Sequence, residues 1–279
     1  MRRVNGFALC YALPPLLWQA LFFAGPLLFL LALTFWSVHS FRLQPDFTLA
    51  NWIKIYGQTY FWRALATTTL FAAAGAMLAS VVAFPASYHI AFRLSPRARR
   101  LALAALMTPF FTSYLVRIYA WQGYLADSGI INSALAHLGF SPVKMLNTAA
   151  GTFVGYLTLC LPLTVLLQTF GLSRVEKNLP DASHNLGCGP LRTVFAVVIP
   201  GARAGLTVAA LFSFILIFGD FASPVYLGGA TSQTLSILIT DLAKAGQQWP
   251  RAAVAAMTMI AALLAAAFVA LRFAYRRPA

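Results

Sequence analysis

Long stretches without Asp, Glu, Lys or Arg constrain the fold of this chain more than any other feature of the sequence. A helix that crosses the hydrocarbon core of a bilayer, about 30 Å thick, needs about 20 predominantly apolar residues. Six such stretches occur, at about residues 4–36, 63–93, 100–121, 147–171, 202–218 and 252–271. The sequence therefore predicts an all-α integral membrane protein with six transmembrane helices.

The first charge-free stretch continues to Phe41 and is too long for one span. Pro14 and Pro15 indicate a short leading segment followed by a helix that ends near Trp36. Arg2 and Arg3 before an apolar run would also fit a cleavable signal peptide, whose apolar region is about 7 to 15 residues long. The length of the run favours an uncleaved first span over that alternative.

The composition agrees with a membrane protein, because 60% of the residues are hydrophobic and only 9% are charged. A mean hydropathy of +0.76 leaves too little polar surface for a soluble domain of this length. The net charge of +14 would suggest nucleic acid as a partner in a soluble chain. Here it has another explanation, because the basic residues lie unevenly between the spans.

With the N-terminus in the cytoplasm, 13 of the 20 basic residues fall on the cytoplasmic side. They are Arg2, Arg3, Arg93, Arg97, Arg99, Arg100, Arg174, Lys177, Arg192, Arg203, Arg272, Arg276 and Arg277. The other 7 fall outside, namely Arg42, Lys54, Arg63, Arg117, Lys144, Lys244 and Arg251. The positive-inside rule then predicts both termini in the cytoplasm. It also explains most of the positive charge, so nucleic acid is not expected as a partner.

Prolines interrupt three of the predicted spans, at Pro85, Pro109 and Pro162. Each lacks the N–H that a helix needs, so neighbouring groups must satisfy the freed carbonyls inside the membrane.

No motif for catalysis or for nucleotide binding is present. The sequence contains no GxxxxGK[ST] phosphate loop, no nucleophile elbow and no HExxH. We therefore expect no enzyme activity, no metal and no cofactor in this chain, and any ATP-driven function must draw its energy from another chain.

The segment between the fourth and fifth spans, residues 172–202, is the most informative part of the chain. Pro180 suits the first turn of a helix, and Gly187 suits a left-handed helix stop. Pro190 would open a second helix, and Pro200 marks the start of the fifth span. We predict a helix, a glycine turn and a second helix on the inner face of the membrane. A plain connecting loop is the alternative that local sequence alone leaves open.

The segment resembles the EAA loop of permease subunits of type I ABC importers. The family pattern is Glu-Ala-Ala, three residues, Gly, nine residues, Ile, any residue and Leu-Pro. Here Asp181-Ala182-Ser183, Gly187, Val197 and Ile199-Pro200 keep that order and spacing. Asp181 replaces Glu, Ser183 replaces the second Ala, and Val197 and Ile199 stand at the Ile and Leu positions, so every departure is conservative.

Other stretches look like those of permeases in spermidine/putrescine importers, so the resemblance covers nearly the whole chain. They are Tyr114-Leu115-Val116-Arg117-Ile118-Tyr119-Ala120-Trp121, Gly129-Ile130-Ile131-Asn132, Phe218-Gly219-Asp220-Phe221, Leu227-Gly228-Gly229 and Trp249-Pro250. Relatives that carry other small solutes share these stretches.

The resemblance implies a MetI-like permease domain over residues 1–279, with residues 172–202 as its coupling loop. The site residues that it implies for docking to an ATPase are Asp181, Ala182, Ser183, Gly187, Ile199 and Pro200. It implies four other subunits: a second permease, two ATPase subunits that bind ATP and Mg, and an extracytoplasmic solute-binding protein. The complex would lie in the inner membrane of a bacterial cell, in contact with lipid.

Polyamines are the solute class that the resemblance favours, and an aminophosphonate, an opine or another organic cation is the alternative. An ion-coupled secondary transporter would favour carboxylates inside the membrane or repeated halves, and neither is evident. A membrane-embedded enzyme would need clustered nucleophiles, bases or metal ligands, which the sequence also lacks.

Asp220 ends the fifth span in a charge-free region between Arg203 and Asp241. An acidic side chain at that depth is costly unless it faces a cavity or has a partner. It would contact a cationic solute, or it would pair with Arg117 or cap the loop that contains Ser223, and the structural alternatives are slightly favoured.

Tyr114, Tyr119 and Trp121 would offer aromatic faces to an ammonium group. The favoured alternative is that most of them belong to the aromatic belt at the membrane interface. Gly228 and Gly229 predict a turn in an outer loop that also contains Thr231 and Ser232, near the binding protein.

Overall fold

The structure, a computed structural model, describes residues 6–39, 42–176, 178–229 and 233–275. Five of the basic residues used for the orientation, Arg2, Arg3, Lys177, Arg276 and Arg277, lie outside the described residues, as do Thr231 and Ser232. The chain divides into two compact units, Met1–Arg63 with Leu238–Ala261 and Ala64–Ile237 with Ala262–Ala279.

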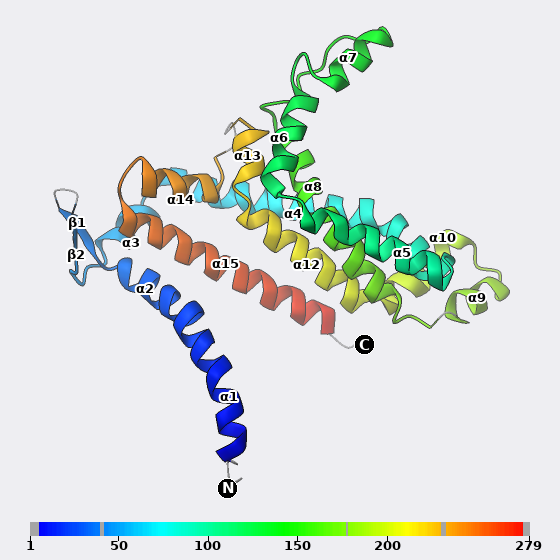
Figure 1. Ribbon diagram of the computed structural model, residues 1–279, viewed down its shortest axis with the longest axis horizontal. Helices are drawn as coiled ribbons and strands as arrows, with labels where there is room; N and C mark the ends of the chain where they lie inside the picture. The colour runs from blue at the N-terminus through cyan, green and yellow to red at the C-terminus, as the bar shows by residue number, and fades with distance from the viewer. Residues whose placement is uncertain (1–5, 40–41, 177, 230–232, 276–279) are drawn as a thin grey trace. The chain divides into compact units, whose positions relative to one another are not determined.

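Helices make up most of the described chain, as predicted (Figure 1). Four of them are long and apolar enough to cross a membrane, within Leu13–Leu33, Thr59–Arg93, Ala149–Leu172 and Trp249–Tyr275. Two bent pairs raise the number to as many as six, which agrees with the predicted six spans. These pairs are Pro96–Phe111 with Tyr114–His137, and Pro190–Gly201 with Arg203–Gly219.

In the first unit, α1 (Gly6–Gln19), η1 (Ala20–Ala24) and α2 (Gly25–Leu33) follow one another without a break. The predicted leading segment is therefore wrong, because Pro14 and Pro15 lie inside α1. Each proline removes one intrahelical hydrogen bond, a loss that a transmembrane helix can tolerate where other groups satisfy the freed carbonyl.

A short hairpin follows α2, in β1 (Ser37–His39) and β2 (Arg42–Gln44), and adds a small antiparallel ladder to an otherwise helical fold. In α3 (Ala50–Tyr56), the Asn51 side chain donates hydrogen bonds to the carbonyls of Thr34 and Trp36 at 2.9 and 2.7 Å. These bonds satisfy carbonyls at the end of the first span that no helix could pair.

The second unit begins within α4 (Thr59–Tyr88) and contains the central helices of the fold. It also takes in the last part of α15 (Trp249–Tyr275), while α14 (Leu235–Lys244) begins in it. Its remaining elements are η2 (His89–Arg93), α5 (Pro96–Met107), η3 (Thr108–Phe111), α6 (Tyr114–Leu125), α7 (Ile130–His137), α8 (Ala149–Leu172), α9 (Asn178–Asn185), α10 (Pro190–Thr193), η4 (Val194–Val198), α11 (Ile199–Gly201), α12 (Arg203–Gly219) and α13 (Ala222–Tyr226).

The third predicted span is not one straight helix. It bends by 89° between η3 and α6, where Pro109 lies in the 3₁₀ turn and Thr112 and Ser113 have extended backbone. Figure 1 shows α6 and α7 running away from α5 at this bend. The sequence signalled a break at Pro109, but its angle depends on the packing of α6 against α8 and α13.

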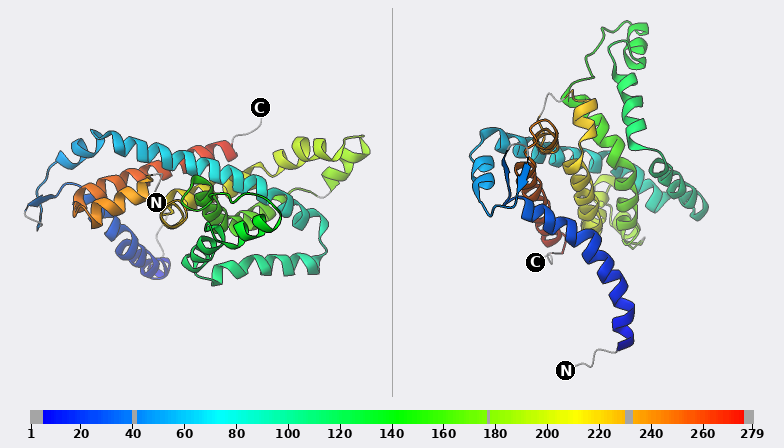
Figure 2. Two further views of the ribbon diagram at one scale, coloured as in Figure 1. Left: turned by 90° about the horizontal axis from the view of Figure 1, so that it is seen from above. Right: turned by 60° about the vertical axis from the view of Figure 1, so that its left-hand side comes forward.

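The helices α8 and α12 lie side by side and form the central contact of the second unit (Figures 1 and 2). A Cβ atom placed on Gly171 would lie 2.8 Å from the Cα atom of Gly205, so the two backbones touch at this crossing. Small residues permit such close approach in membranes, where van der Waals packing drives helix association.

Hydrogen bonds between side chains also join the central helices. Thr164 of α8 and Ser213 of α12 are 2.7 Å apart, and Ser87 of α4 donates to Gln168 Oε1 at 3.1 Å. Gln168 in turn donates to the Ser80 carbonyl at 3.0 Å. These buried polar groups are hydrogen-bonded to one another. They therefore stabilise the packing of the helices at no cost from unpaired polar groups in lipid.

We predict that Gly171→Ala lowers the stability of the detergent-solubilised protein by about 1–3 kcal/mol, the usual range for overpacking. The added Cβ would force α8 and α12 apart. The matched control is Gly123→Ala in α6, where a Cβ meets nothing within 4 Å. Thermal unfolding should show a lower midpoint for Gly171→Ala alone. Equal midpoints for both variants would contradict the close crossing.

Candidate functional site

The predicted coupling segment, residues 172–202, forms the helix, turn and second helix that the sequence indicates. Helix α9 contains Pro180 in its first turn. Pro180 and Ser183 are buried, and the Ser183 hydroxyl lies 3.0 Å from the Thr193 hydroxyl of α10. One face of α9 is therefore held against the second helix.

Gly187 ends α9 as predicted, with a left-handed backbone at φ +81°. The Gly187 amide donates to the His184 carbonyl at 2.9 Å, and the Cys188 amide donates to the Ser183 carbonyl at 3.1 Å. This pair of bonds is the Schellman motif, in which a glycine lets the chain reverse while satisfying the last helical carbonyls. The turn defines where α10 begins relative to α9.

A neighbouring face of α9, continued by the residue that follows it, is exposed and partly apolar. Leu179, Ala182 and Leu186 recur at helical spacing, and Leu186 is 85% exposed. Asp181 is exposed next to them, and Leu191 of α10 is 75% exposed. Large apolar side chains grouped on a short exposed helix are typical of a surface that binds a protein.

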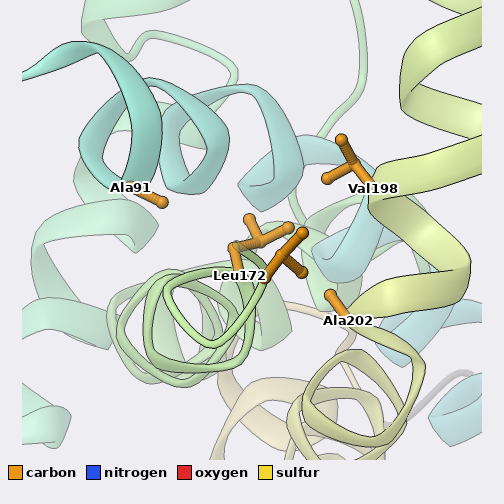
Figure 3. Close-up of a cluster of buried hydrophobic side chains, with 5 residues drawn as sticks. Ala91, Leu172, Val198 and Ala202 are labelled. Atoms are coloured by element: carbon orange, nitrogen blue, oxygen red, sulfur yellow. The ribbon is translucent and has the colours of Figure 1, made fainter. Parts of the chain in front are cut away.

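Both ends of the coupling segment are attached to one buried cluster (Figure 3). Leu172 ends α8 and Val175 follows it, while Val198 ends η4 and Ala202 directly precedes α12. Ala91 of η2 completes the cluster, and Figure 3 shows these side chains gathered around Leu172. The segment is therefore anchored to the bundle at both ends.

Ile199 and Pro200 lie in α11, just before a bend of 80° to α12. Ile199 is half-buried and Pro200 is exposed. The predicted fifth span starts where expected, because α12 begins at Arg203. If α12 crosses the bilayer, the bend leaves residues 190–201 along the membrane surface.

At the other end of α12, Asp220 is buried and its carboxylate accepts three hydrogen bonds. The donors are the Ala222 amide at 2.9 Å, the Ser223 amide at 3.3 Å and the Tyr114 hydroxyl at 2.8 Å. The Tyr114 hydroxyl also lies 2.6 Å from the Ser223 hydroxyl. Asp220 therefore caps the loop that contains Ser223, as one of the sequence alternatives proposed, and joins α6 to α13.

The other two aromatic candidates pack against neighbouring rings. The Tyr119 ring packs against Tyr226 at 5.3 Å between centroids, and the Trp121 ring packs against Tyr124 at 5.8 Å. Of the predicted path residues, Tyr114 alone is hydrogen-bonded to Asp220, while Tyr114 and Trp121 both pack against the buried cluster that contains Ile118.

The predicted glycine turn in the outer loop is present, since Gly229 has φ +60°. The adjacent backbone is fixed to the bundle, because the Asn147 amide donates to the Leu227 carbonyl at 2.8 Å.

Among the described residues, the Arg117 guanidinium is not hydrogen-bonded to Asp220. Its Nη1 atom donates to the Thr158 carbonyl of α8 at 3.0 Å. The sequence analysis did not predict this contact. Pro162 lies four residues after Thr158 and deprives the Thr158 carbonyl of its helical donor, so it is the sequence feature that indicates a donor from elsewhere.

The sequence model of one protein family, described as the binding-protein-dependent transport system inner membrane component, matches residues 75–277. The chain belongs to this family. Its members are non-catalytic membrane subunits of ABC transporters.

Three curated relatives of this permease have informative names. It is 32% identical to the inner membrane ABC transporter permease protein YdcU of Escherichia coli K12, over 77% of this chain and 74% of YdcU. It is 26% identical to the spermidine/putrescine transport system permease protein PotB of Haemophilus influenzae, over 88% of this chain and 87% of PotB. It is also 26% identical to PhnU of Salmonella paratyphi A, named for 2-aminoethylphosphonate transport, over 81% of this chain and 80% of PhnU.

The fold of the permease matches solved structures of ABC importers. A chain of the bacterial ABC transporter involved in import of the acidic polysaccharide alginate superposes with a TM-score of 0.77, covering 97% of this chain and 96% of that one. The sequence identity is 16%, so the match concerns the fold alone. The predicted MetI-like permease fold is confirmed.

We predict that Tyr114→Phe in the permease lowers the free energy of unfolding by about 1–3 kcal/mol, the range for a lost hydrogen bond to a buried polar or charged group. The variant removes the bond to Asp220 and leaves a buried carboxylate with one donor fewer. Tyr124→Phe is the control, since Tyr124 is 42% exposed. Thermal unfolding in detergent checks the prediction, and an unchanged midpoint for Tyr114→Phe would contradict it.

Proposed function

We propose that this permease forms half of the solute path of an ATP-driven importer and couples to a cytoplasmic ATPase through α9. ATP and Mg bind to that ATPase and not to this chain. The complex contains a second permease, two ATPase subunits and an extracytoplasmic solute-binding protein. Both termini of the permease lie in the bacterial cytoplasm, and residues 1–279 work as one membrane domain.

The exposed face of α9 is the observation that carries this proposal. Its apolar residues Leu179, Ala182 and Leu186 lack cover within the described part of the chain, and Asp181 lies beside them. In the proposed orientation this face points to the cytoplasm. A short helix is a suitable docking element there, because it moves as a rigid body.

The attachment of α9 supports a role in transmitting motion. The Ser183–Thr193 contact and the Gly187 turn hold α9 to α10, while the cluster around Leu172 holds both ends of the segment to the bundle. Ile199 and Pro200 form the last turn before the bend at Ala202. An ATPase that moves α9 would thereby reorient α12.

Polyamines are the proposed solute class, because PotB aligns along most of both chains. The relative PhnU supports the alternative of an aminophosphonate, and an opine or another organic cation stays within the same proposal. An ion-coupled secondary transporter is disfavoured, since the family model covers most of the chain.

The Asp220 carboxylate is proposed to be structural rather than a contact for a cationic solute. Three donors already surround it, and a passing ammonium group would have to displace one of them. Tyr119 is 52% exposed and remains the better candidate for contact with a solute or with lipid.

We predict that Gly187→Val leaves the permease in the membrane but abolishes ATP-driven uptake. A β-branched residue is an outlier at positive φ, and the strain of about 1–3 kcal/mol would redirect α9. The measurement is solute uptake into proteoliposomes that contain the whole complex, with immunoblotting of the membrane fraction.

The matched control for this prediction is Gly189→Val. Gly189 lies two residues away with an ordinary extended backbone, φ −66° and ψ 162°, and with nothing within 4 Å of a Cβ. It should keep most of the uptake. Normal uptake by Gly187→Val would exclude the proposed coupling role.

The solute class is tested on the cognate binding protein by calorimetry with putrescine, spermidine, 2-aminoethylphosphonate and an opine. We expect the polyamines to bind most tightly. Binding of only a different solute would reject the polyamine proposal and leave the permease assignment intact.

A further inference from the structure

A proline interrupts α8 near its middle and leaves one backbone carbonyl without its usual partner. Pro162 has no N–H, so the carbonyl of Thr158, four residues earlier, loses its intrahelical hydrogen bond. In a transmembrane helix no water is available to replace that bond, and an unsatisfied carbonyl is costly.

The guanidinium of Arg117 supplies the missing donor from another helix. Its Nη1 atom lies 3.0 Å from the Thr158 carbonyl oxygen. A cationic side chain within a span is itself costly unless it pairs with another polar group or a backbone carbonyl. One contact therefore gives a partner both to the freed carbonyl of α8 and to the Nη1 atom of Arg117, while the buried Nε atom of Arg117 has no hydrogen-bond partner among the described residues.

The same guanidinium also contacts the network at the end of α12. The Arg117 Cζ atom lies 5.7 Å from the centre of the Tyr114 ring, a cation–π distance. The Tyr114 hydroxyl donates to Asp220 and contacts Ser223. Arg117 thus lies between the interruption of α8 and the cap of α13.

We infer that Arg117 is a positioning residue, which holds the Pro162 interruption of α8 against α6 by satisfying the Thr158 carbonyl. In this role the charged guanidinium holds two helices together and does not bind the solute. The inference about the contact is independent of the proposed function, and only the uptake readout below depends on it.

A double-mutant cycle with Arg117→Met and Pro162→Ala tests the inference in the whole complex. Pro162→Ala restores an N–H that can bond to the Thr158 carbonyl, so the donor from Arg117 becomes dispensable. We expect Arg117→Met to reduce uptake about tenfold in the wild-type background and clearly less in the Pro162→Ala background. The two substitutions should therefore be non-additive, as expected for groups that interact. The thermal midpoint of the purified complex should show the same pattern.

Pro85→Ala in α4 is the matched control, because Pro85 is also a proline inside a long helix but frees a different carbonyl. Combined with Arg117→Met, it should restore neither uptake nor the thermal midpoint. Restoration by Pro85→Ala to the same extent would show a general gain in helix stability and would overturn the inference.

Other results of the same cycle would contradict the positioning role of Arg117. If Arg117→Met changes neither uptake nor stability, or has equal effects with and without Pro162, the inference is wrong. If Arg117→Met fails to accumulate, Pro162→Ala should restore its amount in the membrane, and failure to do so would also count against the inference. If the cycle shows an interaction in stability while the wild-type complex transports nothing, the positioning role stands and the proposed function fails.

Discussion

The contact between α8 and α12 at Gly171 and Gly205 is the constraint on which the rest of the second unit depends. Without a Cβ on either residue, the two backbones touch where α8 ends and α12 begins. The coupling segment leaves from one side of this crossing and returns to the other. Its two ends are therefore close together, and the buried cluster of Leu172, Val175, Val198 and Ala202 can form between them. A larger residue at the crossing would separate the ends and remove that cluster.

The bilayer as solvent explains the polar contacts at the other end of these helices. Asp220 accepts three hydrogen bonds, and the Thr158 carbonyl accepts one from Arg117. In water such groups could remain hydrated, but in lipid each one needs a partner from the protein. The result is a network that joins α6, α8, α12 and α13 at the places where their helical geometry is interrupted. Tyr114 and Asp220, which the sequence offered as contacts for a cationic solute, are hydrogen-bonded to each other in this network.

Several features could be predicted from sequence because they depend on local chemistry. The apolar stretches placed the spans, Gly187 indicated a left-handed turn, and Pro190 indicated the start of a helix, all of which the structure contains. The 89° bend after Pro109 and the continuous helix through Pro14 and Pro15 were not predictable. A proline shows where a helical bond is lost, but packing decides whether the helix bends there.

The sequence by itself determined the family, the number of candidate spans and the form of the coupling segment. These follow from hydropathy, from residues with restricted backbone angles and from a motif of fixed spacing. Only the tertiary structure decided which polar groups meet. Tyr114 and Asp220 are 106 residues apart, and Arg117 and Thr158 are 41 apart, so no local pattern encodes either contact. Their pairing results from the packing of α6 against α8 and α13, because a buried polar group in lipid must use whichever partner that packing brings within reach.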